Sequence, residues 1–241
     1  MSGGAGIFYG VGVGPGDPEL LTLKAVQLLK EAPVVVVPQA SRGQESLALS
    51  VVREHLSAAC RVHYLHFPMT RDENRLGEAW DVALTTVRGF LDEGKNVLFL
   101  TIGDPMLYST CIYVLERLQA RGYAVQVIPG VPSFCAAAAA AAFPLVKGDE
   151  RLAVLPWNEK DPPSSLLLSS FDTVVLLKVA SHLPRAVAAL KEAGLLQQSV
   201  LVSNCGRTDE AISGELEKAA RQENPPPYLS LILARRQKEE L

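Results

Sequence analysis

Three short segments rich in glycine and proline contain the residues best suited by type and spacing to hold a ligand. In the first, residues 9–17, four glycines alternate with small residues. A backbone with so few side chains lets another segment or a ligand approach closely. The second, residues 103–105 (Gly-Asp-Pro), and the third, residues 129–131 (Pro-Gly-Val), each follow a strand-like run. Open parallel sheets bind ligands at the carboxyl ends of their strands, so these turns are candidate binding segments.

The first segment does not match known phosphate-binding loops. A dinucleotide-binding Gly-x-Gly-x-x-Gly frame starting at Gly10 would need glycine where Pro15 stands, and one starting at Gly12 would need it at Asp17. An acidic helix cap at Asp17 also opposes a pyrophosphate at the positive end of the helix dipole. No Gly-Lys-Ser/Thr sequence is present, which excludes a P-loop. A nicotinamide-dependent oxidoreductase is therefore disfavoured, and the glycines serve either tight packing or another ligand.

Metal-ligating side chains show no convincing pattern. His63 and His66 lie three residues apart on one expected strand, so they point to opposite faces. The cysteines form no Cys-x-x-Cys pair, which is typical of reduced thiols in a cytosol. We expect no protein-bound metal. The four cysteines are Cys60, Cys111, Cys135 and Cys205.

Composition excludes several classes of protein. The 241 residues are 48% hydrophobic, which is ample for a sizeable core. The 23 basic and 26 acidic residues nearly balance, and no Lys/Arg run marks a nucleic-acid surface. No apolar run reaches the roughly 18–20 residues of a membrane span, and the start of the chain lacks the basic region of a signal peptide. We expect a cytoplasmic protein with neither a nucleic-acid nor a membrane partner.

Strand-like and helix-like patterns alternate around the three segments, which predicts two α/β domains. We place their boundary in a polar link, giving residues 1–146 and 147–241. In the first expected helix, Asp17 is the N-cap and Pro18 the first residue. The expected strands lie around Val11 and at residues 34–37, 61–66, 96–101, 124–128, 152–155, 173–178, 199–204 and 228–234, with a short one near 210–214. The other expected helices end near Leu56 and Arg121 or span residues 73–93, 135–142, 183–193 and 216–221.

In this order and spacing, the three segments resemble the tetrapyrrole (uroporphyrin-III-type) methyltransferases. That family opens with Val-Gly-x-Gly-Pro-Gly-Asp-Pro, has a strand ending in Gly-Asp-Pro, and has Pro-Gly-Val/Ile before an alanine-rich helix. Residues 11–25 match the opening, and the resemblance covers essentially the whole chain. It implies two α/β domains with S-adenosylmethionine in the trough between them, and a homodimer.

Further segments resemble the branch of the family that methylates C20 of precorrin-2 in vitamin B12 synthesis. The resemblance implies S-adenosylmethionine-dependent methyl transfer to that tetrapyrrole, giving precorrin-3A. The alternatives are the same reaction on cobalt-factor II, methylation of another ring carbon, and a carrier without catalysis. Residues 38–40 (Pro-Gln-Ala) replace the acidic-Arg-Leu pattern of uroporphyrinogen methyltransferases, which argues against that substrate. The segments are residues 45–50, 67–72, 103–110 and 148–156.

Carried over position by position, the resemblance also implies a site. Asp104 either accepts the proton that leaves C20 or caps its own turn, and Tyr108 either borders the pocket or belongs to the core. Lys178 either contacts the cofactor or reaches a substrate carboxylate. Two or three basic residues should meet the ring carboxylates, from Arg42, Arg71, Arg75, Lys147, Arg151 and Arg207. The implied cofactor contacts are Pro15, Ile102, Gly103, Asp104, Leu107, Pro132, Ser133, Lys178, Val179, Cys205, Gly206 and Ile232.

Overall fold

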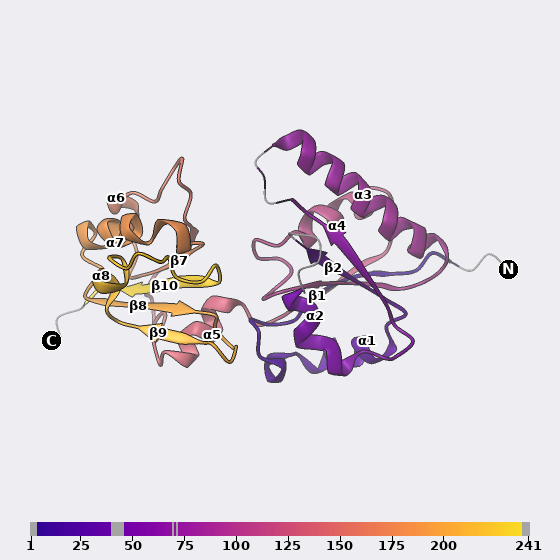
Figure 1. The fold of residues 1–241 in the computed structure, drawn as a ribbon, viewed down its shortest axis with the longest axis horizontal. Helices are drawn as coiled ribbons and strands as arrows, with labels where there is room; N and C mark the ends of the chain where they lie inside the picture. Colours follow the sequence, from indigo (N-terminus) through magenta and orange to yellow (C-terminus); the bar gives the residue numbers. More distant parts are fainter. Residues whose placement is uncertain (1–3, 40–45, 69, 71, 238–241) are drawn as a thin grey trace. The chain divides into compact units, whose positions relative to one another are not determined.

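A computed structural model describes residues 4–39, 46–68, 70 and 72–237, and it divides into two compact units between Pro132 and Ser133 (Figure 1). Both units are α/β, which confirms the expected fold class. The division falls earlier than the boundary expected after residue 146. The reason is that helix α5 (Ser133–Ala140) packs against strand β10 (Ser230–Arg235) of the second unit.

The first unit is built on a five-stranded parallel sheet with the strand order β3-β2-β4-β1-β5. Its central strands are apolar runs buried on both faces, as parallel sheets require. The register pairs Gly12 with Thr101 and Val11 with both Leu100 and Ile128. The strands are β1 (Phe8–Gly12), β2 (Val34–Gln39), β3 (Arg61–His66), β4 (Val97–Thr101) and β5 (Val125–Ile128).

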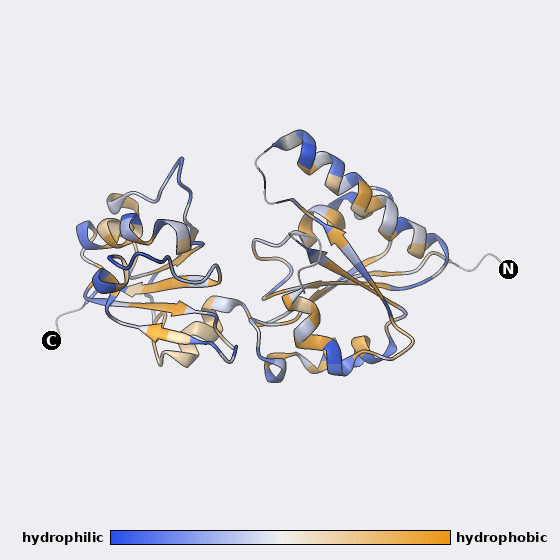
Figure 2. Ribbon diagram, in the orientation of Figure 1, coloured by the Kyte–Doolittle hydropathy of each residue, from blue (hydrophilic) through white to orange (hydrophobic). Residues whose placement is uncertain are grey.

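Two pairs of helices cover the two faces of this sheet (Figure 1). Successive strand residues alternate between the faces. Val34 and Val36 of β2 therefore belong to the core between the sheet and helices α3 and α4. Val35 and Val37 belong to the core between the sheet and helices α1 and α2. Figure 2 shows hydrophobic strands flanked by helices whose outer surfaces are hydrophilic. The helices are α1 (Leu23–Glu31), α2 (Leu47–Val52), α3 (Glu73–Asp92) and α4 (Cys111–Gln119).

The first helix begins later than the sequence predicted. Asp17 does act as a cap, since its Oδ1 accepts a 2.8 Å hydrogen bond from the Glu19 N–H. It caps only a single 3₁₀ turn, Pro18–Leu20, and Thr22 then caps α1 through a 3.2 Å bond from the Ala25 N–H. Two capping residues stand close together in the sequence, and the prediction chose the first of them.

The strand order creates a switch point at the carboxyl ends of β1 and β4. These strands are neighbours, but the chain leaves β1 for β2 and leaves β4 for β5, which lie on opposite sides of the pair. A ligand crevice in an open α/β sheet lies outside the carboxyl ends of the strands at such a point. The three glycine and proline turns follow β1, β4 and β5, so the topology brings them to this one edge.

The second unit has a mixed five-stranded sheet with the strand order β6-β7-β10-β8-β9. Strand β6 is parallel to β7, and β10 is antiparallel to both β7 and β8. The short strand expected near residues 210–214 is present as β9. None of the helices in the described part of the chain is both long and apolar enough for a membrane span. The remaining elements are β6 (Leu152–Pro156), β7 (Thr173–Leu177), β8 (Gln198–Ser203), β9 (Ala211–Ser213), α6 (Ser165–Leu168), α7 (Leu183–Glu192) and α8 (Leu216–Ala219).

Candidate functional site

The turns after β1, β4 and β5 pack against one another through their backbones. Gly14 and Gly103 form a two-residue bridge, with the Gly103 N–H donating to the Gly14 carbonyl at 2.7 Å and the reverse bond at 3.3 Å. A Cβ added to Gly12 would lie 2.6 Å from both the Gly103 carbonyl oxygen and the Gly130 nitrogen. A Cβ on Gly130 would lie 2.8 Å from the Gly12 Cα. We call these four glycines the glycine junction.

The junction decides what the alternating glycines do. At Gly12 and Gly130 the close neighbour is backbone, so these positions serve packing, one of the two interpretations that the sequence left open. Gly14 and Gly103 have φ angles of 72° and 74°, in the left-handed region that glycine adopts without steric cost. The junction therefore fixes the three strand-end turns as one rigid platform.

Asp104 joins the second turn to the third. Its Oδ1 accepts a 2.8 Å hydrogen bond from the Met106 N–H, and its Oδ2 accepts a 3.0 Å bond from the Gly130 N–H. Of the two roles predicted for this carboxylate, the structure shows the cap, and it extends that cap to a distant segment. The role of proton acceptor stays a prediction.

The segment on either side of Asp104 presents apolar side chains at the edge of the platform. Met106 is 52% exposed and Tyr108 is 50% exposed, while Ile102 and Leu107 are half-buried. The prediction that Tyr108 belongs to the core is therefore wrong, and the alternative, a place at the border of a pocket, stays a prediction. Tyr108 also has a φ of 50°, which is rare for a bulky residue.

Two hydroxyl residues behind this loop were missed by the sequence analysis. Thr101, the last residue of β4, and Ser109 are both buried, and their oxygens lie 3.0 Å apart. Ser109 Oγ also accepts a 3.1 Å bond from the Cys111 N–H at the start of α4. A serine just before a helix is a recognisable capping signal, but nothing local in the sequence points to its partner.

In the second unit, the predicted cofactor contacts Lys178, Cys205 and Gly206 follow strand ends on one side of the sheet. Strands β6, β7 and β8 run in the same direction, because β6 is parallel to β7 and both β7 and β8 oppose β10. Lys178 follows β7 directly, and Cys205 and Gly206 follow β8 after Asn204. Lys178 and Asn204 have φ angles of 58° and 51°, so two non-glycine residues at this edge hold left-handed backbone. Such conformations concentrate at functional sites.

Glu210 fixes the loop after β8. Its Oε2 accepts a 2.8 Å hydrogen bond from the Gly206 N–H. The pKa of the Cys205 thiol is raised to about 12 by burial, by the charge of Glu210 and by a hydrogen bond to that carboxylate. A thiol with so high a pKa stays protonated at neutral pH. Asp209 braces the same loop through Asn204 at 2.8 Å and Arg207 at 3.0 Å. Both acids were missed, since their partners depend on the folded loop.

Other predicted contacts lie in less accessible places. Val179 and Ile232 are fully buried in the core of the second unit, so a contact from either side chain would require that core to open. Pro15 is buried within the first turn, and Pro132 and Ser133 are half-buried. Ser133 begins α5 and so belongs to the second unit, whereas Pro132 ends the first.

The basic residues proposed for the ring carboxylates have mixed surroundings. Arg42 and Arg71 lie outside the described residues. Arg207 pairs with Asp209, and Arg151 Nε lies 4.0 Å from Asp172. The other two described candidates, Arg75 and Lys147, are exposed. No group of three or more His, Cys, Asp or Glu in the described ranges is arranged to hold a metal ion.

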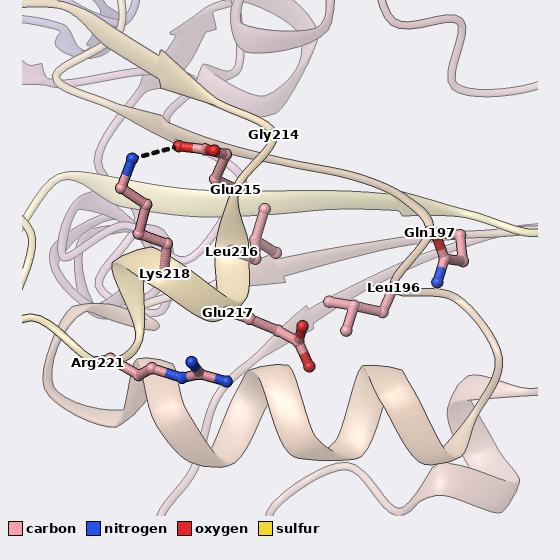
Figure 3. A pocket seen from close by; sticks show the side chains of 8 residues that line it. All are labelled: Leu196, Gln197, Gly214, Glu215, Leu216, Glu217, Lys218 and Arg221. Atoms are coloured by element: carbon pink, nitrogen blue, oxygen red, sulfur yellow. Dashed lines mark hydrogen bonds and ion pairs between the residues drawn. The ribbon is translucent and has the colours of Figure 1, made fainter.

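A cavity of about 430 Å³ lies elsewhere, between the Leu196–Gln197 turn and α8 (Figure 3). Leu196 and Gln197 precede β8, so the cavity is at the edge of the sheet opposite to Cys205. Both acidic side chains of its lining are already paired, Glu215 with Lys218 and Glu217 with Lys191, each at 2.8 Å. We therefore assign the candidate site to the strand-end turns and not to this cavity.

Comparison with known proteins gives a family match along most of the chain. The family model described as Tetrapyrrole (Corrin/Porphyrin) Methylases matches residues 8–220. A protein of Salmonella typhimurium named cobalt-precorrin-2 C(20)-methyltransferase is 34% identical, covering 97% of this chain and 98% of the relative. A probable cobalt-precorrin-2 C(20)-methyltransferase of Methanocaldococcus jannaschii is 36% identical, covering 95% of each. A precorrin-2 C(20)-methyltransferase of Sinorhizobium is 34% identical, covering 97% of each.

Solved structures share the fold. The uroporphyrin-III C-methyl transferase of Thermus thermophilus, complexed with S-adenyl homocysteine, is 25% identical with a TM-score of 0.67, covering 95% of this chain and 92% of that one. The cobalt precorrin-4 methyltransferase CbiF is 24% identical with a TM-score of 0.72, covering 95% of this chain and 94% of that one.

Proposed function

The chain belongs to the tetrapyrrole methylase family, and on that basis we propose that it transfers a methyl group from S-adenosylmethionine to C20 of precorrin-2 or its cobalt-containing counterpart, a step of cobalamin synthesis. The observation that carries the proposal is near-full-length similarity, at 34–36% identity, to three relatives named for that reaction. The segments at residues 45–50, 67–72 and 148–156 resemble the same branch.

The strand-end platform suits a nucleoside without phosphates. Asp17 and Asp104 stand at two of its turns, and carboxylates there disfavour a pyrophosphate but not a sulfonium cation. When bound, S-adenosylmethionine supplies a methyl group that is already activated as an electrophile. We propose cofactor contacts from the loop that includes Ile102, Gly103 and Leu107. The other proposed contacts are Pro15, Asp104, Pro132, Ser133, Lys178, Val179, Cys205, Gly206 and Ile232.

The protein's own contribution is then orientation and the exclusion of water. The glycine junction and Asp104 hold the turns in one arrangement, which keeps the bound reactants aligned. Alignment of this kind is worth roughly 7–11 kcal/mol of barrier reduction. Because both Asp104 oxygens already accept backbone hydrogen bonds, we propose that Asp104 is a positioning residue.

Two ring substrates fit the proposal. The Salmonella and Methanocaldococcus relatives are named for the cobalt-containing ring, and the Sinorhizobium relative is named for precorrin-2. The identities of 34%, 36% and 34% do not separate them. The two substrates are therefore tested side by side.

The test is an anaerobic assay of the purified protein with methyl-labelled S-adenosylmethionine and either precorrin-2 or cobalt-factor II. We expect one methyl group on C20 of one ring, read by mass and by the position of the label, and the faster ring identifies the substrate. If the protein binds S-adenosylhomocysteine but transfers methyl to neither ring, the C20 assignment is wrong and methylation of another ring carbon becomes the proposal. Absence of cofactor binding would overturn it.

We also propose a cytoplasmic homodimer. The support is the resemblance to the family, together with apolar side chains exposed on two helices, Leu23 on α1 and Val82 on α3. Sedimentation equilibrium measures the mass in solution, and a species of about 26 kDa at micromolar concentration would contradict the dimer.

A further inference from the structure

Ser109, one of the two hydroxyl residues near the candidate site, is held by three hydrogen bonds. Ser109 Oγ lies 3.0 Å from Thr101 Oγ1 and accepts a 3.1 Å bond from the Cys111 N–H. The Ser109 carbonyl accepts a third bond, from the Ile112 N–H at 3.3 Å. Thr101 is itself fixed, because it ends β4 and its carbonyl accepts a 2.9 Å bond from the Val13 N–H. Ser109 is therefore anchored to the central sheet and to helix α4 at once.

Tyr108 lies between this anchor and the glycine junction. On its other side, the Leu107 N–H donates to the Asp104 carbonyl at 3.3 Å, and Asp104 is bound to Gly130. Tyr108 lies between these two fixed residues, Asp104 and Ser109, and has a φ of 50°. Left-handed backbone is sterically costly for a residue with a large side chain, and it persists only where the surroundings impose it.

Core packing does not explain this conformation. Tyr108 is 50% exposed, and its loop neighbour Met106 is 52% exposed. An exposed aromatic ring and an exposed thioether in one short loop offer apolar surface of the kind that packs on a flat conjugated ligand. A strained backbone that holds an exposed aromatic ring at the carboxyl edge of a parallel sheet favours a ligand contact.

We propose that Tyr108 contacts the ring of the tetrapyrrole substrate and that Thr101 and Ser109 are positioning residues that act through it. This proposal rests on the proposed methyl transfer and adds the substrate-facing residue and its support. The hydroxyl pair sets the position of Ser109, Ser109 sets the left-handed turn, and the turn sets the direction of the Tyr108 ring.

The test is a double-mutant cycle on the methyl-transfer assay. Tyr108→Gly removes the ring and keeps a residue that favours the left-handed backbone. We expect kcat/KM for the ring substrate to fall by about ten-fold or more, with the Kd of S-adenosylhomocysteine, measured by calorimetry, changed by less than about three-fold. Thr101→Val removes the hydroxyl at constant shape and should also lower kcat/KM, and Thr101→Ser should restore it.

The decisive measurement is Thr101→Val in the Tyr108→Gly background. If Thr101 acts through the ring, its substitution has no further effect on kcat/KM once the ring is absent. An equal loss in both backgrounds would show a merely structural role and overturn the positioning pair. A Tyr108→Gly enzyme within two-fold of wild type would overturn the substrate contact.

Two matched variants serve as controls. Thr86→Val removes a threonine hydroxyl that donates to the Val82 carbonyl at 2.9 Å on α3. Tyr113→Ala removes a ring from α4 that is also 50% exposed. Both should leave kcat/KM unchanged. If the wild-type protein transfers methyl to neither ring, the proposed function and this proposal both fall, whereas an active wild type with an unaffected Tyr108→Gly variant overturns only the latter.

Discussion

The backbone N–H of Gly130 donates a 3.0 Å hydrogen bond to Oδ2 of Asp104, a residue 26 positions earlier in the chain. Asp104 follows β4 and Gly130 follows β5, and β1 lies between these two strands. The bond therefore crosses over the end of β1, where Gly12 packs against both turns. The hydrogen bond between this carboxylate and this glycine thus holds together the turns on which the proposed chemistry depends.

Replacing Asp104 should cost both stability and function. Asp104→Asn keeps the volume, but it leaves one acceptor oxygen and sets an NH₂ group against one of the two backbone N–H donors. We expect the free energy of unfolding to fall by about 1–3 kcal/mol, measured by urea denaturation, and S-adenosylhomocysteine binding to weaken.

The matched control for Asp104 is Asp72. Its Oδ1 also accepts two backbone bonds, from Asn74 at 3.0 Å and Arg75 at 3.3 Å, at the start of α3. Asp72→Ala should cost about 1 kcal/mol of stability and leave cofactor affinity unchanged. Equal effects of the two substitutions on cofactor affinity would contradict the assignment of Asp104 to the site.

The glycine junction predicts opposite effects of alanine at two glycines. Gly130→Ala sets a Cβ against the backbone of Gly12 and the Gly103 carbonyl, none of which has room to move. We expect a loss of at least about 1–3 kcal/mol, or no folded protein. Gly89→Ala, in α3, meets no atom within 4 Å and should stabilise the protein by up to about 1 kcal/mol. A tolerated Gly130→Ala would show that the turns do not pack as described.

Cys111 should make stability depend on pH in the alkaline range. Burial raises the pKa of this thiol from 9.0 to about 12. Above pH 9 the unfolded chain loses the thiol proton and the folded chain keeps it, so the unfolded state binds fewer protons. The contribution to the free energy of unfolding is therefore complete below pH 9 and declines by about 1.4 kcal/mol per pH unit up to pH 12.

The comparison that isolates this effect is wild type against Cys111→Ala. Urea unfolding is measured from pH 8 to 10.5. Over this range the free energy of unfolding should fall less steeply with pH in the variant than in wild type, because the variant lacks one titrating proton. This difference in slope does not depend on the stability of the variant at neutral pH. Parallel curves would show that the folded thiol ionises near its ordinary pKa.

The second unit contains a buried ion pair whose removal should be costly. Arg235 Nη2 lies 2.6 Å from each Glu150 oxygen, with side-chain exposures of 12% and 8%. Arg235→Met removes the guanidinium that neutralises the buried Glu150 carboxylate, and we expect a loss of about 3–5 kcal/mol. Adding Glu150→Gln removes that charge and should recover a large part of the loss.

Fluorescence of Trp157 reports the unfolding of the second unit, because the ring is buried in the core of that unit. The chain has two tryptophans, so Trp80→Phe provides a background in which only Trp157 is read. The control is Lys218→Met, which breaks an exposed pair with Glu215 and should cost less than about 1 kcal/mol. A similarly small cost for Arg235→Met would contradict the buried pair.

Local sequence patterns determined the elements and the motifs of this protein. The run Val34–Val37 predicted a strand buried on both faces, and residues 73–93 predicted a helix that the structure shows as α3, with Gly94 beyond its end at a φ of 75°. These signals depend on neighbours in sequence, namely side-chain periodicity, turn chemistry and caps. The order of the three turns was also sufficient to identify the family, which the comparisons confirm.

Tertiary structure alone decided which residues act together. The partner of Asp104 is Gly130, because the order β4-β1-β5 brings the ends of β4 and β5 to either side of β1. The partner of Ser109 is Thr101, because the loop between β4 and α4 folds back onto the end of β4. In the second unit, packing around β10 places Ile232, a predicted contact, in the core. Hydrogen bonding and burial depend on which strands are neighbours in space. Strand order follows from how the whole sheet is covered, so no window of sequence contains it.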